Sequence, residues 1–233
     1  MKLLKQKQNR IFAIDPSPNG TGFALIESGL LVDYRFCTQA KGPAKKNERA
    51  ILVPKVKLAD ESGRMERLHI VDSTMVHLCR LWQPSMVAME DYTFGGGNKS
   101  GGTLQIGELG GVLRLHLWKM GYQTRTYHPG SVKLFWTGRG DAEKKDMIAQ
   151  AMIVLDRTGC LLLSEFKKLA MLYQEAISDA LAIGLLLVKE LSFRRGEWLL
   201  NGAPEGIVRV FNRVTDSMPV CLIDRLFMER ENK

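Results

Sequence analysis

The sequence predicts an α/β protein in which a mixed five-stranded sheet is flanked by helices. Three observations support this: strand-type runs gather near the N-terminus, later strand-type runs alternate with helical ones, and the last long apolar-faced segment is helical. Strands first and mixed units later favour a mixed sheet with helices on its faces. The length of 233 residues fits one domain with additions and suffices to bury a substantial core.

The first three strands are expected within residues 10–38. IFAI is a short apolar run, and DPSPNGTG after it is dense in turn-forming residues. FALIE is apolar again, and LLVDYRFCT forms a third extended segment. These segments predict an antiparallel meander.

Residues 40–63 interrupt this pattern with Pro, Gly and many Lys residues, which predicts a long basic insertion or loop. A solvated linker is favoured slightly over a contact with the DNA backbone. An amphipathic helix is expected over 64–81, because apolar residues recur there every three or four positions. A strand over 84–90 and a glycine-rich loop follow, and then a helix over 103–120.

The second half continues with shorter elements. YQTRTYH predicts a strand, SVKLFW one helical turn, and residues 142–155 a helix. Residues 165–191 contain a long apolar-faced helix. From residue 192 onward, FRRGEW, NGAPEG and IVRVFNRV suggest an appendage with one or two short strands.

Composition limits the class of protein only loosely. The net charge of +8 and the pI near 9.4 suit a polyanion such as nucleic acid, although a plain solvated surface explains them about as well. The four cysteines form no CxxC pair, which indicates buried free thiols in a reducing compartment. Neither a signal peptide nor an apolar run of transmembrane length is evident, so a cytoplasmic protein without membrane contact is expected.

Three carboxylates stand beside strongly apolar runs, namely Asp15, Glu90 and Asp179. An unpaired carboxylate is costly in such a place, and three of them require a common explanation. At ~4 Å two carboxylates repel by about 1 kcal/mol in water and about 4 kcal/mol at an effective dielectric of 20. A divalent cation removes this repulsion, and oxygen ligands favour Mg²⁺ or Mn²⁺ over zinc. Two such ions can activate water and stabilise the leaving oxygen of a phosphodiester, so a nuclease site is predicted.

A fourth acidic residue is a candidate for the same site. Glu175 precedes Asp179 by four residues, so the two share one face of the expected helix. Glu175 is either a metal ligand, or a group that supports one, or a solvent-facing charge.

At these residues the sequence resembles the RuvC family of Holliday junction resolvases. That family opens with a strand, Asp-Pro and then Thr-Gly, as in IDPSPNGTGFALI around Asp15. Its second carboxylate ends a strand, here AME at Glu90, and a helix similar to LGQARG follows, here IGELGG. Its last carboxylate lies in DALAIA, here DALAIG from Asp179. The family usually has another Asp where this chain has Ala176, so Glu175 is expected to compensate.

The resemblance also points to residues that bind substrate. The family has a Val-Lys pair and then a loop ending in Ala-Glu-Lys, here at Lys133 and Lys144, and its lysines bind the DNA backbone. Arg139 and Lys145 are further candidates from charge alone.

An aromatic wedge into the junction centre is also implied by the family. Tyr92 and Phe94 follow Glu90 and are the two candidates, with packing of the loop as the alternative. His128, beside the DNA-binding segment, is expected to be structural rather than a phosphate ligand.

The resemblance covers roughly residues 10–190. It implies an RNase H-like fold, Mg²⁺ dependence with two ions per site and Mn²⁺ as a substitute, a homodimer, and paired nicks at a four-way junction in branched double-stranded DNA. Residues 1–191 are then the nuclease domain, and 192–233 are an extension without a recognised counterpart, as in a phage or mobile-element member. GGGNKSGG lacks the GxxxxGK[ST] arrangement, so no nucleotide cofactor is expected.

Three alternatives stay open. One is an RNase H-like nuclease that cuts forks, flaps or other branched DNA, and another is a junction-binding protein that does not cleave. A sugar or acetate kinase of the actin-like superfamily also begins with a strand, an Asp and a glycine-rich turn, but it needs a second related domain and a longer chain.

Overall fold

In a computed structural model of the chain, the described residues are 10–17, 20–39, 48–55, 60–91, 101–197 and 205–216. Within them one sheet has the strand order β4-β3-β2-β1-β5-β6. The strands are β1 (Arg10–Asp15), β2 (Gly22–Glu27), β3 (Leu30–Thr38), β4 (Ala50–Leu52), β5 (Met86–Glu90) and β6 (Thr124–Tyr127). The helices are α1 (Glu61–Trp82), α2 (Gly101–Lys119), α3 (Pro129–Thr137), α4 (Lys144–Arg157), α5 (Leu163–Lys167), α6 (Met171–Arg194) and α7 (Glu205–Asp216).

The sheet is mixed, as predicted. Strands β1, β2 and β3 pair antiparallel as a meander, whereas β5 runs parallel to β1 and β6 parallel to β5. Helix α1 connects β4 to β5, and α2 connects β5 to β6. Helix α2 forms the crossover between the parallel neighbours β5 and β6, and α1 connects the edge strand β4 to β5 on the other side of β1.

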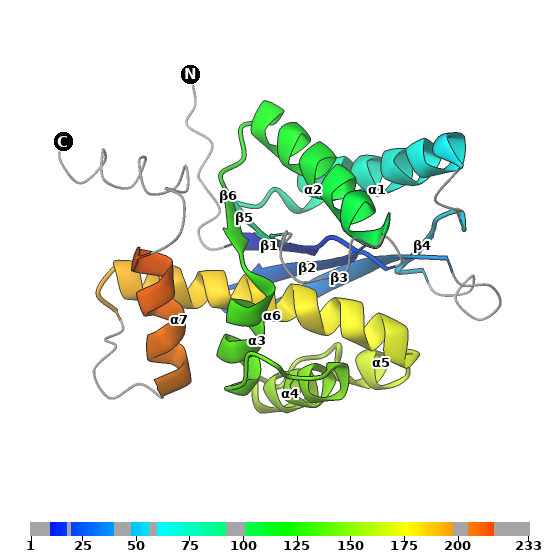
Figure 1. Ribbon diagram of the computed structural model, residues 1–233. Helices are drawn as coiled ribbons and strands as arrows, with labels where there is room; N and C mark the ends of the chain where they lie inside the picture. The colour runs from blue at the N-terminus through cyan, green and yellow to red at the C-terminus, as the bar shows by residue number, and fades with distance from the viewer. Residues whose placement is uncertain are drawn as a thin grey trace, which may run out of the picture.

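Helices cover both faces of the sheet (Figure 1). Helices α1 and α2 lie on one face, where Phe12 and Ile14 of β1 enter a core with Met75 and Leu113. Helix α6 packs across β1 and β2 on the other face, together with α3 and α4. Because successive side chains of a strand point to opposite faces, the central strands are buried on both sides. The predicted α/β architecture is confirmed.

Among the described residues the sheet has six strands rather than the five that were predicted. The additional strand is β4, which pairs parallel to β3 and lies inside the segment 40–63 that was expected to be a loop. Helix α1 also begins inside this segment, at Glu61, with Asp60 as its N-cap. Three residues are too few to show an alternating pattern, which is why the sequence did not reveal β4. Residues 40–47 and 56–59 lie outside the described residues.

The C-terminal appendage is helical where short strands were predicted. IVRVFNRV lies in α7, and α6 continues to Arg194 instead of ending at residue 191. Ile207, Val210 and Phe211 recur at the three- and four-residue spacing of one helical face, and this spacing outweighs the preference of valine and isoleucine for strands. In α7 this face includes Val210 and Phe211, which are fully buried. No helix in the described part of the chain is both long and apolar enough to span a membrane.

Candidate active site

Two of the predicted carboxylates lie at adjacent strand ends. Strands β1 and β5 are parallel neighbours with Ile14 opposite Met89, so Asp15 and Glu90 end them at the same edge of the sheet. Asp15 is in phase with Ala13, and Glu90 with Ala88, both of which face α6. Both carboxylates therefore point to the face that α6 covers.

Helix α6 approaches the sheet closely at two glycines. A Cβ added at Gly22 would overlap the carbonyl oxygen of Ala176 and stand 2.6 Å from its carbonyl carbon. A Cβ added at Gly184 would overlap the end of Ile26 and stand 2.9 Å from the Cβ of Ala13. Because Gly22 pairs with Asp15 in the β1–β2 register, this approach brings the first half of α6 to the strand ends.

The turn after Asp15 is held by a buried threonine. Thr21 is fully buried, and its Oγ1 donates a hydrogen bond of 2.9 Å to the carbonyl oxygen of Ser17. Its own carbonyl oxygen accepts from the backbone N–H of Cys37 on β3 at 2.9 Å. The Thr-Gly pair therefore has two separate structural tasks: the threonine closes the turn and the glycine admits α6.

The four acidic residues influence one another strongly. Burial raises the pKa of Asp15 well above its ordinary value, and the neighbouring charges of Glu90, Asp179 and Glu175 raise it further. Asp15 and Glu90 lie close enough for each to affect the pKa of the other. The structure thus brings together the four acidic residues that the sequence singled out.

The pKa values of the other two strongly affected carboxylates also lie high. Burial, and next the charge of Asp179, raises the pKa of Glu90 to about 8, while Lys133 opposes the shift. Burial, and next the charge of Glu175, raises the pKa of Asp179 to about 7, while Lys133 and Lys144 oppose it. At neutral pH the cluster cannot be fully ionised without added positive charge.

Two lysines supply part of that charge. The Nζ of Lys144, the first residue of α4, forms an ion pair with Oε1 of Glu175. The Lys144 side chain is 69% exposed and Glu175 only 18%, so the lysine reaches inward from the surface. Lys133 on α3 lies near enough to lower the pKa of Glu90 and of Asp179. The two lysines that were predicted to bind DNA therefore border the carboxylates.

The donor set suits a hard divalent cation. All four side chains offer carboxylate oxygens, which is the ligand chemistry of Mg²⁺ and Mn²⁺. In the part of the chain that is described, no three acidic, His or Cys side chains already stand as ligands around one point. Glu175 instead forms an ion pair with Lys144. A bound cation would reduce the repulsion among these carboxylates and offset the cost of burying their negative charge.

The remaining candidates lie farther from the cluster. The Nε of Arg139 pairs with Asp141 at 3.3 Å, and the Nζ of Lys145 pairs with Glu143 at 2.9 Å, both on the exposed surface. Both basic groups lie between α3 and the first turn of α4. Tyr92 and Phe94 lie outside the described residues.

His128 has a structural role, as expected. It is the N-cap of α3, and its Nδ1 accepts a hydrogen bond of 3.0 Å from the backbone N–H of Gly130. The helix that carries Lys133 therefore begins at a defined residue.

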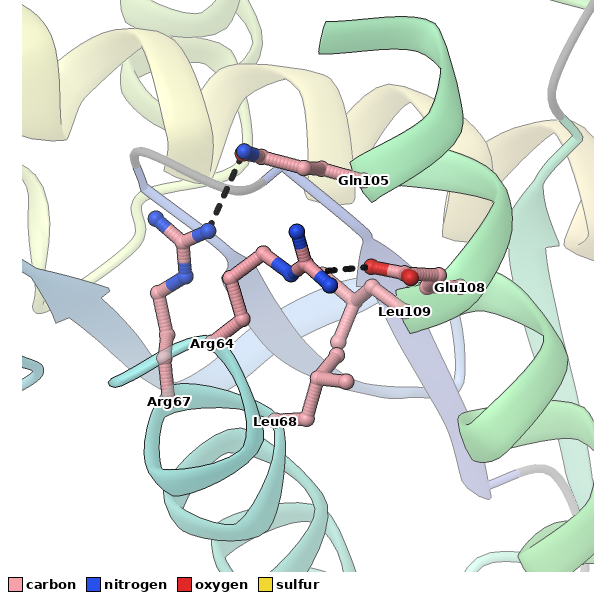
Figure 2. Close-up of a pocket in the computed structure, with 6 residues that line it drawn as sticks. All are labelled: Arg64, Arg67, Leu68, Gln105, Glu108 and Leu109. Atoms are coloured by element: carbon pink, nitrogen blue, oxygen red, sulfur yellow. Dashed lines mark hydrogen bonds and ion pairs between the residues drawn. The ribbon is translucent and has the colours of Figure 1, made fainter. Parts of the chain in front are cut away.

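An arginine pair between α1 and α2 was missed by the sequence reasoning. Figure 2 shows Arg64 and Arg67 of α1 reaching toward α2 across a small cleft. Arg67 donates to Oε1 of Gln105 at 3.0 Å, and Nε of Arg64 lies 4.0 Å from Oε2 of Glu108. Burial lowers the pKa of Arg67, as does the neighbouring Arg64, whereas Glu108 raises it. These two contacts join α1 to α2. In the sequence, the spacing of three residues between Arg64 and Arg67 is the feature that could have indicated the pair.

A protein-family comparison matches most of this chain. The family model described as "Crossover junction endodeoxyribonuclease RuvC" matches residues 11–186. This range contains all four carboxylates and both lysines, and it ends before α7.

Curated relatives agree with the family match. A crossover junction endodeoxyribonuclease RuvC of Prochlorococcus marinus (strain MIT 9301) is 26% identical over 186 residues, which are 79% of this chain and 99% of the relative. The RuvC of Ruegeria pomeroyi is 32% identical over 153 residues, which are 65% of this chain and 80% of the relative.

Solved structures have the same fold. RuvC of Thermus thermophilus matches with a TM-score of 0.50 at 20% identity, covering 80% of this chain and 96% of that one. The yeast mitochondrial Holliday junction resolvase Ydc2 matches with a TM-score of 0.53 at 13% identity, covering 76% of each chain. The mixed sheet flanked by helices is thus shared with known resolvases.

Proposed function

The chain belongs to the RuvC family of crossover junction endodeoxyribonucleases, and we propose that Asp15, Glu90 and Asp179 form the site at which it cuts DNA. The enzyme is a Holliday junction resolving endonuclease. The observation that carries the assignment of the site is the meeting of three carboxylates from β1, β5 and α6 at one sheet edge, with raised pKa values.

The carboxylates hold the metal on which cleavage depends. Asp15, Glu90 and Asp179 are proposed as ligands of Mg²⁺, two ions per site, and Mn²⁺ is expected to substitute. When bound, these ions make a water nucleophilic and stabilise the charge that develops on the leaving oxygen. The protein holds the carboxylates rigidly, because two of them end buried strands and the third lies on a helix packed against those strands.

Glu175 is proposed as the fourth acidic group of the site. It raises the pKa of both Asp15 and Asp179, so it is electrostatically part of the cluster. Glu175 is paired with Lys144, and the exposed ammonium group of this lysine is suited to bind a DNA phosphate. A phosphate that attracts Lys144 leaves Glu175 available to a cation.

Lys133 and Lys144 position the substrate in this proposal. A lysine that contacts a phosphate releases counterions and adds to affinity without reading base sequence. Both lysines border the carboxylates, so each holds the backbone near the bond that is cut. Arg139 and Lys145, which are exposed, extend the same basic surface. Tyr92 and Phe94 stay candidates for a wedge into the junction.

The enzyme is further proposed to act as a homodimer through α2. One face of this helix exposes Leu104, Leu115 and Trp118, the last with 65% of its surface accessible. Gly111 lies in the same stripe, and nothing lies within 4 Å of a Cβ added there. A self-complementary apolar face suits a two-fold dimer, whose two sites match a nearly two-fold junction and give paired nicks.

The division of the chain is proposed with one adjustment. Residues 1–191 are the nuclease domain, although α6 continues to Arg194, and the remainder up to residue 233 is an extension. A bacterial cytoplasm, where the DNA lies, is the proposed location.

Cleavage of synthetic DNA tests the proposal. A labelled four-way junction, a fork and a plain duplex are incubated with enzyme, with and without Mg²⁺. We expect symmetric nicks on the junction alone and only with metal. Equal cutting of forks points instead to a broader branched-DNA nuclease, and binding without any cutting points to a junction-binding protein.

A pair of variants tests the metal site within the same assay. Asp15→Asn should keep junction binding and lower cleavage by about a thousandfold or more, since several kcal/mol of transition-state stabilisation depend on the metal. Asp91→Asn is the matched control, because Asp91 follows Glu90 but pairs with Arg114 at 3.3 Å. Undiminished cleavage by Asp15→Asn would refute the metal site.

A further inference from the structure

Helix α7 lies beyond the residues that match the family, yet it packs on the core of the enzyme. The family match ends at residue 186, whereas α7 spans Glu205–Asp216. It contacts α3, the helix that carries Lys133 (Figure 1). An extension with no counterpart in the matched region therefore touches an element of the proposed substrate site.

The contact uses one apolar face of α7. Val210 and Phe211 are fully buried, and both belong to the core that includes Val132 and Leu134 of α3. The ring of Phe211 stacks on Phe193 of α6, with centroids 5.8 Å apart and an angle of 28° between the planes. Helix α7 thus joins α3 to the C-terminal end of α6.

The N-terminal end of α7 lies against the end of α3. A Cβ added at Gly206 would stand 3.5 Å from Cδ1 of Leu134 and 3.6 Å from the Cα of Gly138. Gly138 is the C-cap of α3, with a φ of 80°, and its N–H donates to the carbonyl oxygen of Leu134. The chain runs from this cap directly into the loop that leads to Lys144.

Helix α3 needs such support. It has nine residues, and a helix this short is not stable by itself in water. Its position comes from the neighbours on which it packs, which are α4, α6 and α7. Leu134, which lies under α7, directly follows Lys133. A shift of α3 therefore moves Lys133 relative to Glu90 and Asp179.

We propose that α7 is a buttress that positions Lys133 for its phosphate contact, with Phe211 as the principal positioning residue. This inference rests on the proposed role of Lys133 in DNA binding. Helix α7 acts through α3 and does not itself contact the junction.

A double-mutant cycle tests the buttress. The dissociation constant for a four-way junction is measured over a series of salt concentrations, in Ca²⁺ to prevent cleavage, for the full-length protein. The variants are Phe211→Ala, Lys133→Ala and the double variant. Arg209→Ala, at an exposed position of α7, is the matched control for direct contact of this helix with DNA. Circular dichroism and thermal unfolding verify that each variant is folded.

If α7 acts through Lys133, Phe211→Ala and Lys133→Ala each weaken binding by about five- to tenfold at low salt and reduce the salt slope by about one. The double variant should then be no weaker than Lys133→Ala alone, because both changes remove the same contact. Arg209→Ala should bind as the wild type does. Phe211→Leu, which keeps an apolar side chain, should restore most of the binding.

Multiplicative losses in the double variant would overturn the inference, and so would a loss with Arg209→Ala equal to that with Phe211→Ala. If Phe211→Ala does not fold, the milder Val210→Ala completes the same cycle with the same expected result. A Lys133→Ala protein that binds like the wild type removes the role of Lys133 and the inference with it. A wild type that shows no preference for the junction over duplex instead contradicts the proposed function itself.

Discussion

Gly22 of β2 lies against the backbone of Ala176 in α6, so closely that a side chain at residue 22 would overlap the Ala176 carbonyl oxygen. Gly22 is the register partner of Asp15, and Ala176 follows Glu175. This one approach therefore sets the distance between the strand-end carboxylates and those of the helix. It also gives a physical reason for the glycine of the Thr-Gly motif.

The glycine contact predicts the effect of Gly22→Ala. The added methyl group must displace α6, so we expect the free energy of unfolding to fall by about 1–3 kcal/mol and cleavage to fall with it. Gly20→Ala is the control, because a Cβ there would stand at an ordinary 3.8 Å from the carbonyl oxygen of Cys37. Urea denaturation and the junction cleavage assay measure the two effects. Equal behaviour of the two variants would show that the approach of α6 does not matter.

The raised carboxylate pKa values predict how stability depends on pH. A carboxyl group whose pKa is higher in the folded protein favours folding below its ordinary value, and that contribution is lost as the pH rises through the folded value. Without divalent metal, the free energy of unfolding should therefore decrease from about pH 4 to the region of the Asp179 and Glu90 pKa values, about 7 and about 8. Urea denaturation at a series of pH values measures this slope.

Metal should reverse that loss. Mg²⁺ binds the ionised carboxylates of the folded state, so millimolar Mg²⁺ should raise the melting temperature at pH 8 more than at pH 5. Asp15→Asn removes one charge, and its metal-free stability should depend less on pH. A melting temperature that Mg²⁺ raises equally in wild type and Asp15→Asn would argue against a metal bound at this cluster.

Neighbouring lysines at the start of α4 give a matched pair of variants. Lys144 pairs with Glu175 of the cluster, whereas Lys145 pairs with Glu143 on the surface. Lys144→Gln should weaken junction binding by about five- to tenfold at low salt and flatten the salt dependence by about one phosphate contact. Lys145→Gln should have a smaller effect. Binding measurements across a salt series decide this, and a reversed order of the two effects would contradict the proposed path of the DNA backbone.

The exposed stripe of α2 predicts the assembly state. Trp118→Glu places a charge within the proposed interface and should convert the dimer to a monomer in sedimentation velocity experiments. Lys119→Glu is the control, because Lys119 is exposed but not part of the stripe. If the wild type is already a monomer at micromolar concentration, or if Trp118→Glu stays dimeric, α2 is not the interface.

Local patterns in the sequence were sufficient for most of the fold and for the choice of carboxylates. Short continuous apolar runs predicted the central strands, and a carboxylate at the end of such a run, as in Asp15 and Glu90, is visible without coordinates. The spacing of Glu175 and Asp179 likewise indicated one helix face. These inferences hold because the backbone periods of strands and helices are fixed by local geometry.

The relations between distant segments were decided only by tertiary packing. The pairing of Lys144 with Glu175, the pairing of β4 with β3 and the packing of α7 against α3 have no signal in local periodicity. Each depends on which surfaces meet when the chain folds: α6 reaches the sheet through Gly22, and α7 is held by Phe211. The sequence alone therefore determined which groups could form the site. Close packing of α6 and α3 against the sheet determined how near the carboxylates and Lys133 lie to one another, and so how strongly their charges interact.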